Sequence, residues 1–166
     1  MGLGWWASKV RQFRAHVRAR VSPAERAALG TWLTSAQLVV FDAMPVADRR
    51  HGLDVVARLR SDGVTENDVL VAGALHDAGK GPDVGVWPRV AWSLGEAWGP
   101  WVVRMARRLP GFGPALDRIR DHAELSAGLA AAAGCSVRTV ELIRYQAEPR
   151  DPDAGALLKR ADETAV

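Results

Sequence analysis

An imidazole and a carboxylate stand side by side in this chain at His76-Asp77, inside the run Ala-Leu-His-Asp-Ala-Gly-Lys-Gly. His51 lies upstream of the pair, and His122 and Asp162 lie downstream. The chain has four histidines, and three of them belong to this set. Imidazoles and carboxylates that converge from several helices suit a transition metal such as Mn²⁺, Fe²⁺, Co²⁺, Ni²⁺ or Zn²⁺ better than Ca²⁺. These residues are therefore the candidate ligands of a metal centre.

The local sequence around the pair indicates how both side chains could reach one ion. Consecutive residues point about 100° apart on a helix, so His76 and Asp77 can converge only where a helix ends. Gly79 and Gly81 follow directly and favour such an end. Asp162 comes after an apolar stripe near the C-terminus, which predicts a position at the edge of the core.

Nearly all of the chain has the periodicity of amphipathic helices. His51 shares a helical face with Val55 and Leu59, so its ring is expected to point inward. No segment alternates with the period of a strand, and the sequence predicts a compact, single-domain all-α bundle. The helices expected from periodicity, caps and breakers cover about 6–21, 22–33, 35–44, 46–62, 65–77, two helices within 84–114 that break near 99–100 and 110–111, 116–133, 137–147 and 153–163. The first 34 residues should pack as N-terminal helices on a domain formed by residues 35–166.

Composition limits the class of protein. With 166 residues, 48% hydrophobic and 25% charged, the chain is typical of one ordinary globular domain. No apolar run is long enough for a membrane span and no signal-peptide pattern is present, so we expect a cytoplasmic protein. Cys135 is the only cysteine, which excludes an internal disulfide. Among the seven tryptophans, Trp32, Trp92 and Trp101 stand at helical spacings and are expected to fill the core or an interface.

The charge gives little guidance about partners. The net charge is +3, and the basic residues are mostly arginines spread along the chain, so no nucleic-acid partner is expected. The first amphipathic segment contains Trp5 and Trp6 and has no acidic residue before Glu25, a pattern that an anionic membrane could bind. Packing of its apolar stripe onto the domain explains the same pattern, so membrane contact is not expected. The sequence leaves the oligomeric state and the role of the tryptophan-rich segment 87–101 open.

The order of these residues resembles the HD-domain superfamily of metal-dependent phosphohydrolases. That family is all-helical and has the ordered set His, His-Asp, Asp, which here reads His51, His76-Asp77 and Asp162, with Gly79-Lys80 after the pair. The resemblance covers roughly residues 35–166, and the order of the helices agrees as well. A His-Asp dipeptide alone carries no information, whereas the ordered four with Ala-Gly-Lys-Gly attached is a specific signal.

The resemblance implies a role for each residue. His51, His76, Asp77 and Asp162 would hold the metal ion, and a water activated by that ion would attack the phosphorus of a small phosphorylated molecule, for example a nucleotide. Asp77 would also orient or deprotonate the water. Lys80 would neutralise charge on the phosphoryl oxygens. His122 would bind the phosphate or protonate the leaving oxygen.

The same resemblance bears on the number of ions. In dinuclear relatives, among them the HD-GYP cyclic-dinucleotide phosphodiesterases, the Asp of the dipeptide bridges two ions and later histidines hold the second. His122 matches one of those histidines, but Gln146 and Ala147 stand where the others are expected, and the Gly-Tyr-Pro signature is missing. The sequence therefore predicts one ion and an activity other than that of HD-GYP enzymes.

Two further classes of function remain open. A non-catalytic module could keep the helical fold and only sense a ligand or bind a protein. A third class is an oxygenase, since some HD-type helical domains hold a di-iron centre, but it needs more ligands than this sequence offers. The complete set His51, His76, Asp77, Lys80 and Asp162 favours a phosphohydrolase over both alternatives.

Overall fold

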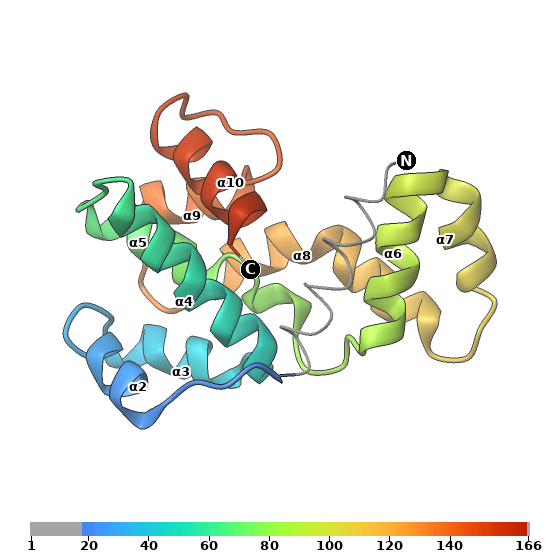
Figure 1. Ribbon diagram of the computed structural model, residues 1–166, viewed down its shortest axis with the longest axis horizontal. Coiled ribbons are helices and arrows are strands. Elements are labelled where there is room, and N and C mark those ends of the chain that lie inside the picture. Colours follow the sequence, from blue (N-terminus) through green and yellow to red (C-terminus); the bar gives the residue numbers. More distant parts are fainter. Residues whose placement is uncertain (1–17, 166) are drawn as a thin grey trace.

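The computed structural model describes residues 18–165, and within that range the chain consists of helices joined by short loops (Figure 1). The all-α prediction is thus confirmed for these residues, which contain no strand. The helices, in chain order, are α2 (Pro23–Leu29), α3 (Ser35–Ala43), α4 (Val46–Ser61), α5 (Asn67–Leu75), the 3₁₀ helix η1 (Ala78–Lys80), α6 (Val86–Trp98), α7 (Pro100–Ala106), α8 (Phe112–Ala132), α9 (Val137–Arg144) and α10 (Ala154–Thr164).

Local sequence accounts for where several helices begin. Ser22 and Thr34 accept hydrogen bonds from the backbone three residues later, and the side chains of Glu25 and Gln37 return the bond to the capping residue. Each pair forms a capping box, which satisfies backbone N–H groups that the first turn leaves free. Ser136 caps α9 by accepting from the backbone N–H of Thr139.

The centre of the larger lobe of the molecule is α5. Its residues from Val69 to Leu75 are all buried, as expected for a helix that is apolar on every side. Helices α4, α9 and α10 pack around it, and side chains from α3 and from the second half of α8 complete the same hydrophobic core. We call this region the main lobe (Figure 1).

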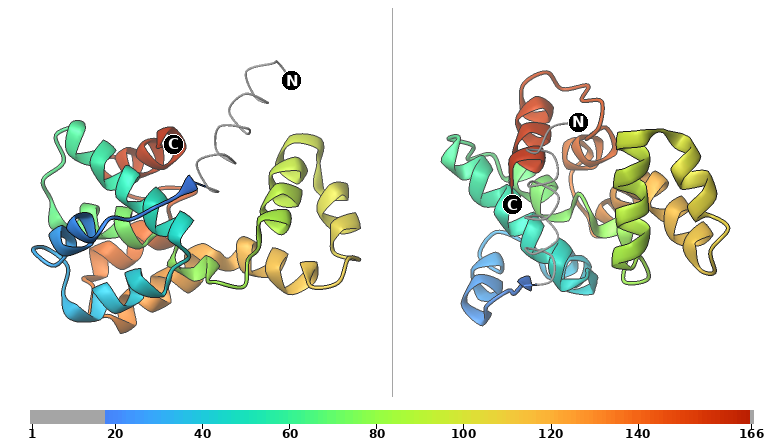
Figure 2. Two further views of the ribbon diagram at one scale, coloured as in Figure 1. Left: turned by 60° about the horizontal axis from the view of Figure 1, so that its bottom comes forward. Right: turned by 45° about the vertical axis from the view of Figure 1, so that its right-hand side comes forward.

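Helices α6 and α7 pack against each other as a hairpin over the first half of α8, away from the main lobe (Figures 1 and 2). A separate small core lies beneath them, built from Val84, Leu116 and Ile119 with partly buried neighbours. We call residues 86–109 the α6–α7 hairpin.

Some expected helix limits differ from the observed ones. The helix after Ser22 ends at Leu29 rather than near residue 33. The cap of α5 is Glu66 and not Thr65. The helix that leads to the His-Asp pair ends at Leu75, and a short 3₁₀ helix replaces the continuous helix expected up to residue 77. Trp101 is exposed and does not fill the core of the chain.

Two expectations fall on the first residues of the chain. Most of the amphipathic segment 6–21, together with Trp5 next to its start, lies outside the described residues. The same holds for residues 1–17 of the expected N-terminal region, which was to end at residue 34. Between residues 18 and 165, no helix is both long and apolar enough to cross a bilayer.

Candidate metal centre

Close packing of α4 on α5 brings His51 next to His76. A Cβ on Gly52 would lie only 2.7 Å from the carbonyl oxygen of Ala74, so only glycine allows the two backbones to approach this closely. His51 precedes that glycine, and His76 follows Ala74 by two residues. As a result the two imidazole rings meet edge to face with their centroids 5.3 Å apart.

A second glycine contact brings α8 to the other side of the pair. A Cβ on Gly79 would overlap the backbone of α8 at His122 and Ser126. The backbone N–H of Gly79 also donates a 2.8 Å hydrogen bond to the hydroxyl oxygen of Ser126. This contact fixes η1 on α8 and places His122 beside Asp77, with His122 Nε2 3.6 Å from Asp77 Oδ1.

The end of α5 turns both members of the pair towards one point. His76 is the last residue with helical dihedrals, whereas Asp77 has φ −100° and ψ 3°. Gly81 then ends the 3₁₀ turn with φ +66°, a conformation that favours glycine. The change of dihedrals leaves His76 Nε2 3.6 Å from Asp77 Oδ1. The sequence prediction that the two side chains converge at a helix end is therefore confirmed.

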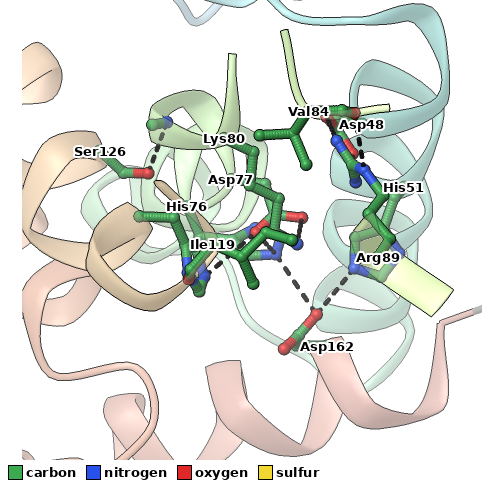
Figure 3. A network of polar contacts seen from close by, with 12 residues as sticks. Asp48, His51, His76, Asp77, Lys80, Val84, Arg89, Ile119, Ser126 and Asp162 are labelled. Carbon is green, nitrogen blue, oxygen red and sulfur yellow. Dashed lines mark hydrogen bonds and ion pairs between the residues drawn. The ribbon is translucent and has the colours of Figure 1, made fainter. Parts of the chain in front are cut away.

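His51, His76 and Asp77 form a group that could hold a metal ion. One potential ligand atom from each lies within 4.8 Å of the others, and His76 and Asp77 are buried (Figure 3). Asp162, from α10, lies against the same group, with its Oδ1 2.7 Å from His51 Nε2 and 3.3 Å from His76 Nε2. The adjacent Glu163 is exposed, so Asp162 is the acidic residue that faces the site.

The orientation of the His76 ring is set from its far side. His76 Nδ1 is 2.9 Å from the carbonyl oxygen of Gly73, and because a carbonyl only accepts, Nδ1 carries the proton of that hydrogen bond. When the ring is neutral, its Nε2 lone pair is directed towards Asp77 and Asp162. Metal-binding histidines commonly hold their second nitrogen in this way. His122 repeats the arrangement, with Nδ1 2.6 Å from the carbonyl oxygen of Ile119.

The His76 Nε2 atom supplies the test of whether a metal fits. It is buried and, within residues 18–165, makes no hydrogen bond, because its 3.3 Å approach to Asp162 has a separation typical of an ion pair without the directionality of a hydrogen bond. A buried nitrogen without a hydrogen-bond partner costs free energy. A divalent cation would accept the lone pair of this nitrogen. The same ion would balance the negative charges of Asp77 and Asp162. The residues present therefore fit a metal ion.

The two carboxylates remain ionised at neutral pH. Burial acts to raise the pKa of Asp77, but the nearby Lys80 and His76 outweigh it and hold that pKa well below the usual range. Burial likewise opposes ionisation of Asp162, and its hydrogen bond with His51 together with the nearby charge of His76 holds its pKa far below normal. In the absence of an ion, both acids are thus charged where a cation would bind.

The pKa values of the buried His76 and the partly buried His122 shift in opposite directions. Burial lowers the pKa of His76, yet the charges of Asp77 and Asp162 prevail and raise it to about 9. Burial lowers the pKa of His122 and prevails there, since only Asp77 acts strongly against it. A metal must accordingly displace a proton from His76, whereas His122 is already neutral.

Lys80 and His122 flank the pair as the sequence predicted. Lys80 Nζ lies 2.5 Å from Asp77 Oδ2, which leaves Oδ1 directed towards the imidazoles. Gln146 also reaches this region, with its amide Nε2 3.2 Å from the carbonyl oxygen of His76 and 3.4 Å from His122 Nε2. The structure thus brings together all six candidate site residues and adds Gln146.

The sequence did not reveal a buried ion pair beside the site. Asp48 is buried one turn before His51 on α4, and Arg89 of α6 binds both of its carboxylate oxygens at 2.6 and 2.7 Å (Figure 3). The sequence did contain a sign that Asp48 lies near the site, because a spacing of three residues places it on the same helical face as His51. No comparable signal exists for Arg89, whose partner lies 41 residues away.

Comparison of the chain with models of protein families, with curated proteins and with solved structures gives no match. Whatever can be inferred about function therefore depends on the arrangement of these side chains.

Proposed function

We propose that the protein is a metal-dependent phosphohydrolase of the HD type, which hydrolyses a small phosphorylated molecule such as a nucleotide. The observation that carries the proposal is the buried His76 Nε2, which lacks a hydrogen bond within the described chain while its ring is held from behind by Gly73. This nitrogen, His51 and two ionised carboxylates form the donor set of a divalent transition metal.

His51, His76, Asp77 and Asp162 would hold the ion. When bound, a divalent ion supplies Lewis acidity towards a phosphoryl oxygen and lowers the pKa of an attacking water. The position of Gln146 near His122 supports a single ion, because an amide stands where a further imidazole would be needed for a second one. An amide is a weaker ligand for these metals than imidazole.

The protein's own residues would perform the remaining steps. Asp77 Oδ1 faces the imidazoles and is well placed to orient the attacking water. Lys80 keeps Asp77 ionised and brings a positive charge to the site, where it can stabilise negative charge on phosphoryl oxygens.

The tautomer of His122 refines its expected role. Because Nδ1 donates to Ile119, Nε2 of the neutral ring is an acceptor. It must therefore first take a proton, for example the one released from the attacking water, before it can donate to the leaving oxygen. Burial lowers the pKa of this ring, so its protonated form donates a proton more readily than an exposed imidazolium.

Metal binding tests the site directly. Purified protein should bind about one equivalent of Mn²⁺ or Co²⁺ in calorimetry, as one site of four protein ligands implies. Since structural metal sites of four ligands bind with about 10–16 kcal/mol, removal of two ligands by His76→Ala with Asp77→Ala should weaken binding by about a thousandfold or more. Asp83→Ala serves as the matched control, because Asp83 is exposed and lies shortly after η1. Unchanged binding in the double variant would refute the site.

Activity is tested by a screen of nucleotides and other phosphoesters with Mn²⁺ or Co²⁺. We expect hydrolysis of at least one substrate class, lost in Asp77→Asn and retained in Asp83→Asn. A protein that binds one metal ion but hydrolyses nothing in a broad panel would instead be a sensor with the same site.

A further inference from the structure

Helix α7 is apolar but has no buried residue. In its sequence Pro-Trp-Val-Val-Arg-Met-Ala, every residue except the first proline and the arginine is a large apolar group or alanine. Val102, Val103 and Ala106 are partly covered by the rest of the hairpin region. The side chains of Trp101 and Met105 are more exposed, at 57% and 52%. Removing apolar surface of this kind from water lowers the free energy of the system.

The exposed side of α7 combines these apolar groups with arginines. Trp101, Arg104, Met105 and Arg108 are spaced by three, one and three residues, so they follow one face of the helix into the next turn. Leu109, also exposed, extends the same surface. Arg108 Nη1 lies 3.5 Å from the sulfur of Met105, which places a cationic group directly beside an apolar one.

Two tryptophans of α6 extend the apolar surface. Trp87 and Trp98 are 11 residues apart, which returns to within about 20° of the same direction after three helical turns. Both are exposed, and the indole N–H of Trp101 donates to the backbone carbonyl of Trp98, so the end of α6 and the start of α7 form one continuous surface. Among residues 18–165, every exposed tryptophan lies on this hairpin.

The charge of the hairpin is almost entirely positive. Between residues 86 and 109, Glu96 is the one acidic residue, against four arginines. Glu96 accepts a hydrogen bond from the indole of Trp92. Arg89 is bound to Asp48 and Arg107 to Asp117. Arg104 and Arg108 form no ion pair with any residue of the described chain, and both lie on the exposed face of α7.

We propose that the α6–α7 hairpin binds the surface of an anionic lipid membrane, with Trp101, Met105 and Leu109 inserted at the level of the headgroups and Arg104 and Arg108 on lipid phosphates. Tryptophan and arginine are suited to this position, because each has an apolar body and a polar or charged end. The proposal is independent of the phosphohydrolase function. It also differs from the membrane contact considered for the first amphipathic segment, since the surface lies in another region of the chain.

Charge and side-chain type favour a membrane over the other occupants of such a surface. A second copy would bring Arg104 and Arg108 against the same arginines across a twofold interface, where like charges repel. Residues 1–17 contain lysine and arginine and no acidic residue, so they lack complementary charge. The bases of a nucleic acid would stack on the tryptophans but would bury little of Met105 and Leu109. Acyl chains would bury all of these side chains, and each burial adds favourable free energy.

The test is co-sedimentation of the full chain with vesicles of phosphatidylcholine alone or mixed with phosphatidylglycerol. We expect binding to the mixed vesicles, weakened by salt. Trp101→Ser with Met105→Ser should lower affinity by about tenfold or more, since both changes delete apolar area that the membrane would remove from water. Arg104→Gln and Arg108→Gln should each lower it about fivefold, the effect of one basic residue near an anionic leaflet.

Matched controls come from the main lobe. Val39→Ser with Val137→Ser removes two apolar side chains of comparable exposure, and Arg160→Gln removes an exposed arginine. Circular dichroism would establish that every variant is folded. Equal binding of hairpin and control variants would overturn the proposal, as would equal binding to vesicles of phosphatidylcholine alone. Hairpin-dependent dimers without lipid, or hairpin-dependent binding to an oligonucleotide at the affinity measured for vesicles, would overturn it in favour of that partner.

Discussion

The main lobe and the α6–α7 hairpin distribute polar and apolar groups in opposite ways. In the main lobe, charged and titratable groups such as His76 and Asp77 are buried at the centre, and α5 is apolar on every side. In the hairpin, apolar groups such as Trp101 and Met105 are exposed and arginines surround them. Buried charge requires a counter-charge or an ion, whereas exposed apolar surface requires a partner. The two regions therefore point to two different kinds of ligand.

The strongest test of this contrast is the ion pair that joins the two regions. Arg89→Met should destabilise the protein by about 3–5 kcal/mol, because Asp48 would remain buried without its partner. Urea unfolding measures this loss. Asp48→Leu added to Arg89→Met should recover some of it, as both charges are then removed. A double variant no more stable than Arg89→Met alone would mean that the pair does more than balance charge.

In the metal-free protein, protonation of His76 should make the free energy of unfolding depend on pH, an effect that the hairpin does not contribute. The pKa of His76 is raised to about 9 from 6.5 in the unfolded chain, so its stabilising effect is complete below pH 6.5 and is lost as the pH rises through 9. The loss should reach about 3 kcal/mol, since one pKa unit corresponds to about 1.4 kcal/mol. Unfolding of metal-free protein in urea between about pH 6.5 and 9.5 measures it.

His76→Gln is the control for this pH dependence. The variant should lose the slope in that range and keep the losses at low pH that the depressed pKa values of Asp77 and Asp162 cause. An unchanged slope over the same alkaline range would assign the effect to another group.

Glycine substitutions compare the contact of η1 with α8, which supports the site, with a position on α8 where an added Cβ would face open space. Gly79→Ala should cost about 2 kcal/mol, because its Cβ would press on the backbone of α8 at His122 and Ser126. Gly128→Ala on α8 is the matched control, since no atom lies within 4 Å of its Cβ position, and it should stabilise the protein by up to about 1 kcal/mol. Thermal unfolding of both variants would measure the difference, and equal effects would contradict the packing argument.

The smallest expected effect lies in the hairpin. Trp101→Ser should change the free energy of unfolding by less than about 0.5 kcal/mol, as is usual for exposed residues. A loss above about 2 kcal/mol in urea unfolding would show that the tryptophan belongs to the folded core, and the exposed surface would then not be free for a partner.

The helices and most site residues could be predicted from the sequence because their signals are local. Proline and glycine at 99–100 and 110–111 end helices wherever the rest of the chain lies, and the hydroxyl of Ser136 caps α9 by accepting from the backbone N–H of Thr139, three residues away. The order of His51, His76-Asp77 and Asp162 could be recognised because imidazole is rare in this chain. The structure places these four side chains together, while their roles as ligands stay a prediction.

Features that depend on tertiary packing could not be predicted. The pairing of Arg89 with Asp48 joins helices 41 residues apart. Trp101 was expected to fill the core or an interface and is not in the core, because periodicity identifies an apolar face and not what covers it. The reach of Gln146 to His122 likewise depends on how α9 meets α8. In each case the missing information is which helix lies opposite.

Helix α8 has a mechanical consequence for the whole molecule. Its 21 residues give a length of about 30 Å, with the hairpin seated on its first half, His122 near the middle and main-lobe contacts such as Ala127 in its second half. If α8 tilted as a rigid body, its contact with Gly79 at His122 and Ser126 would be the part that moves least. The arm from this point to the hairpin end of α8 is about 15–20 Å, so a tilt of about 10° would carry that end through about 3 Å. Force applied to the outer hairpin would reach the imidazole of His122 as a small rotation.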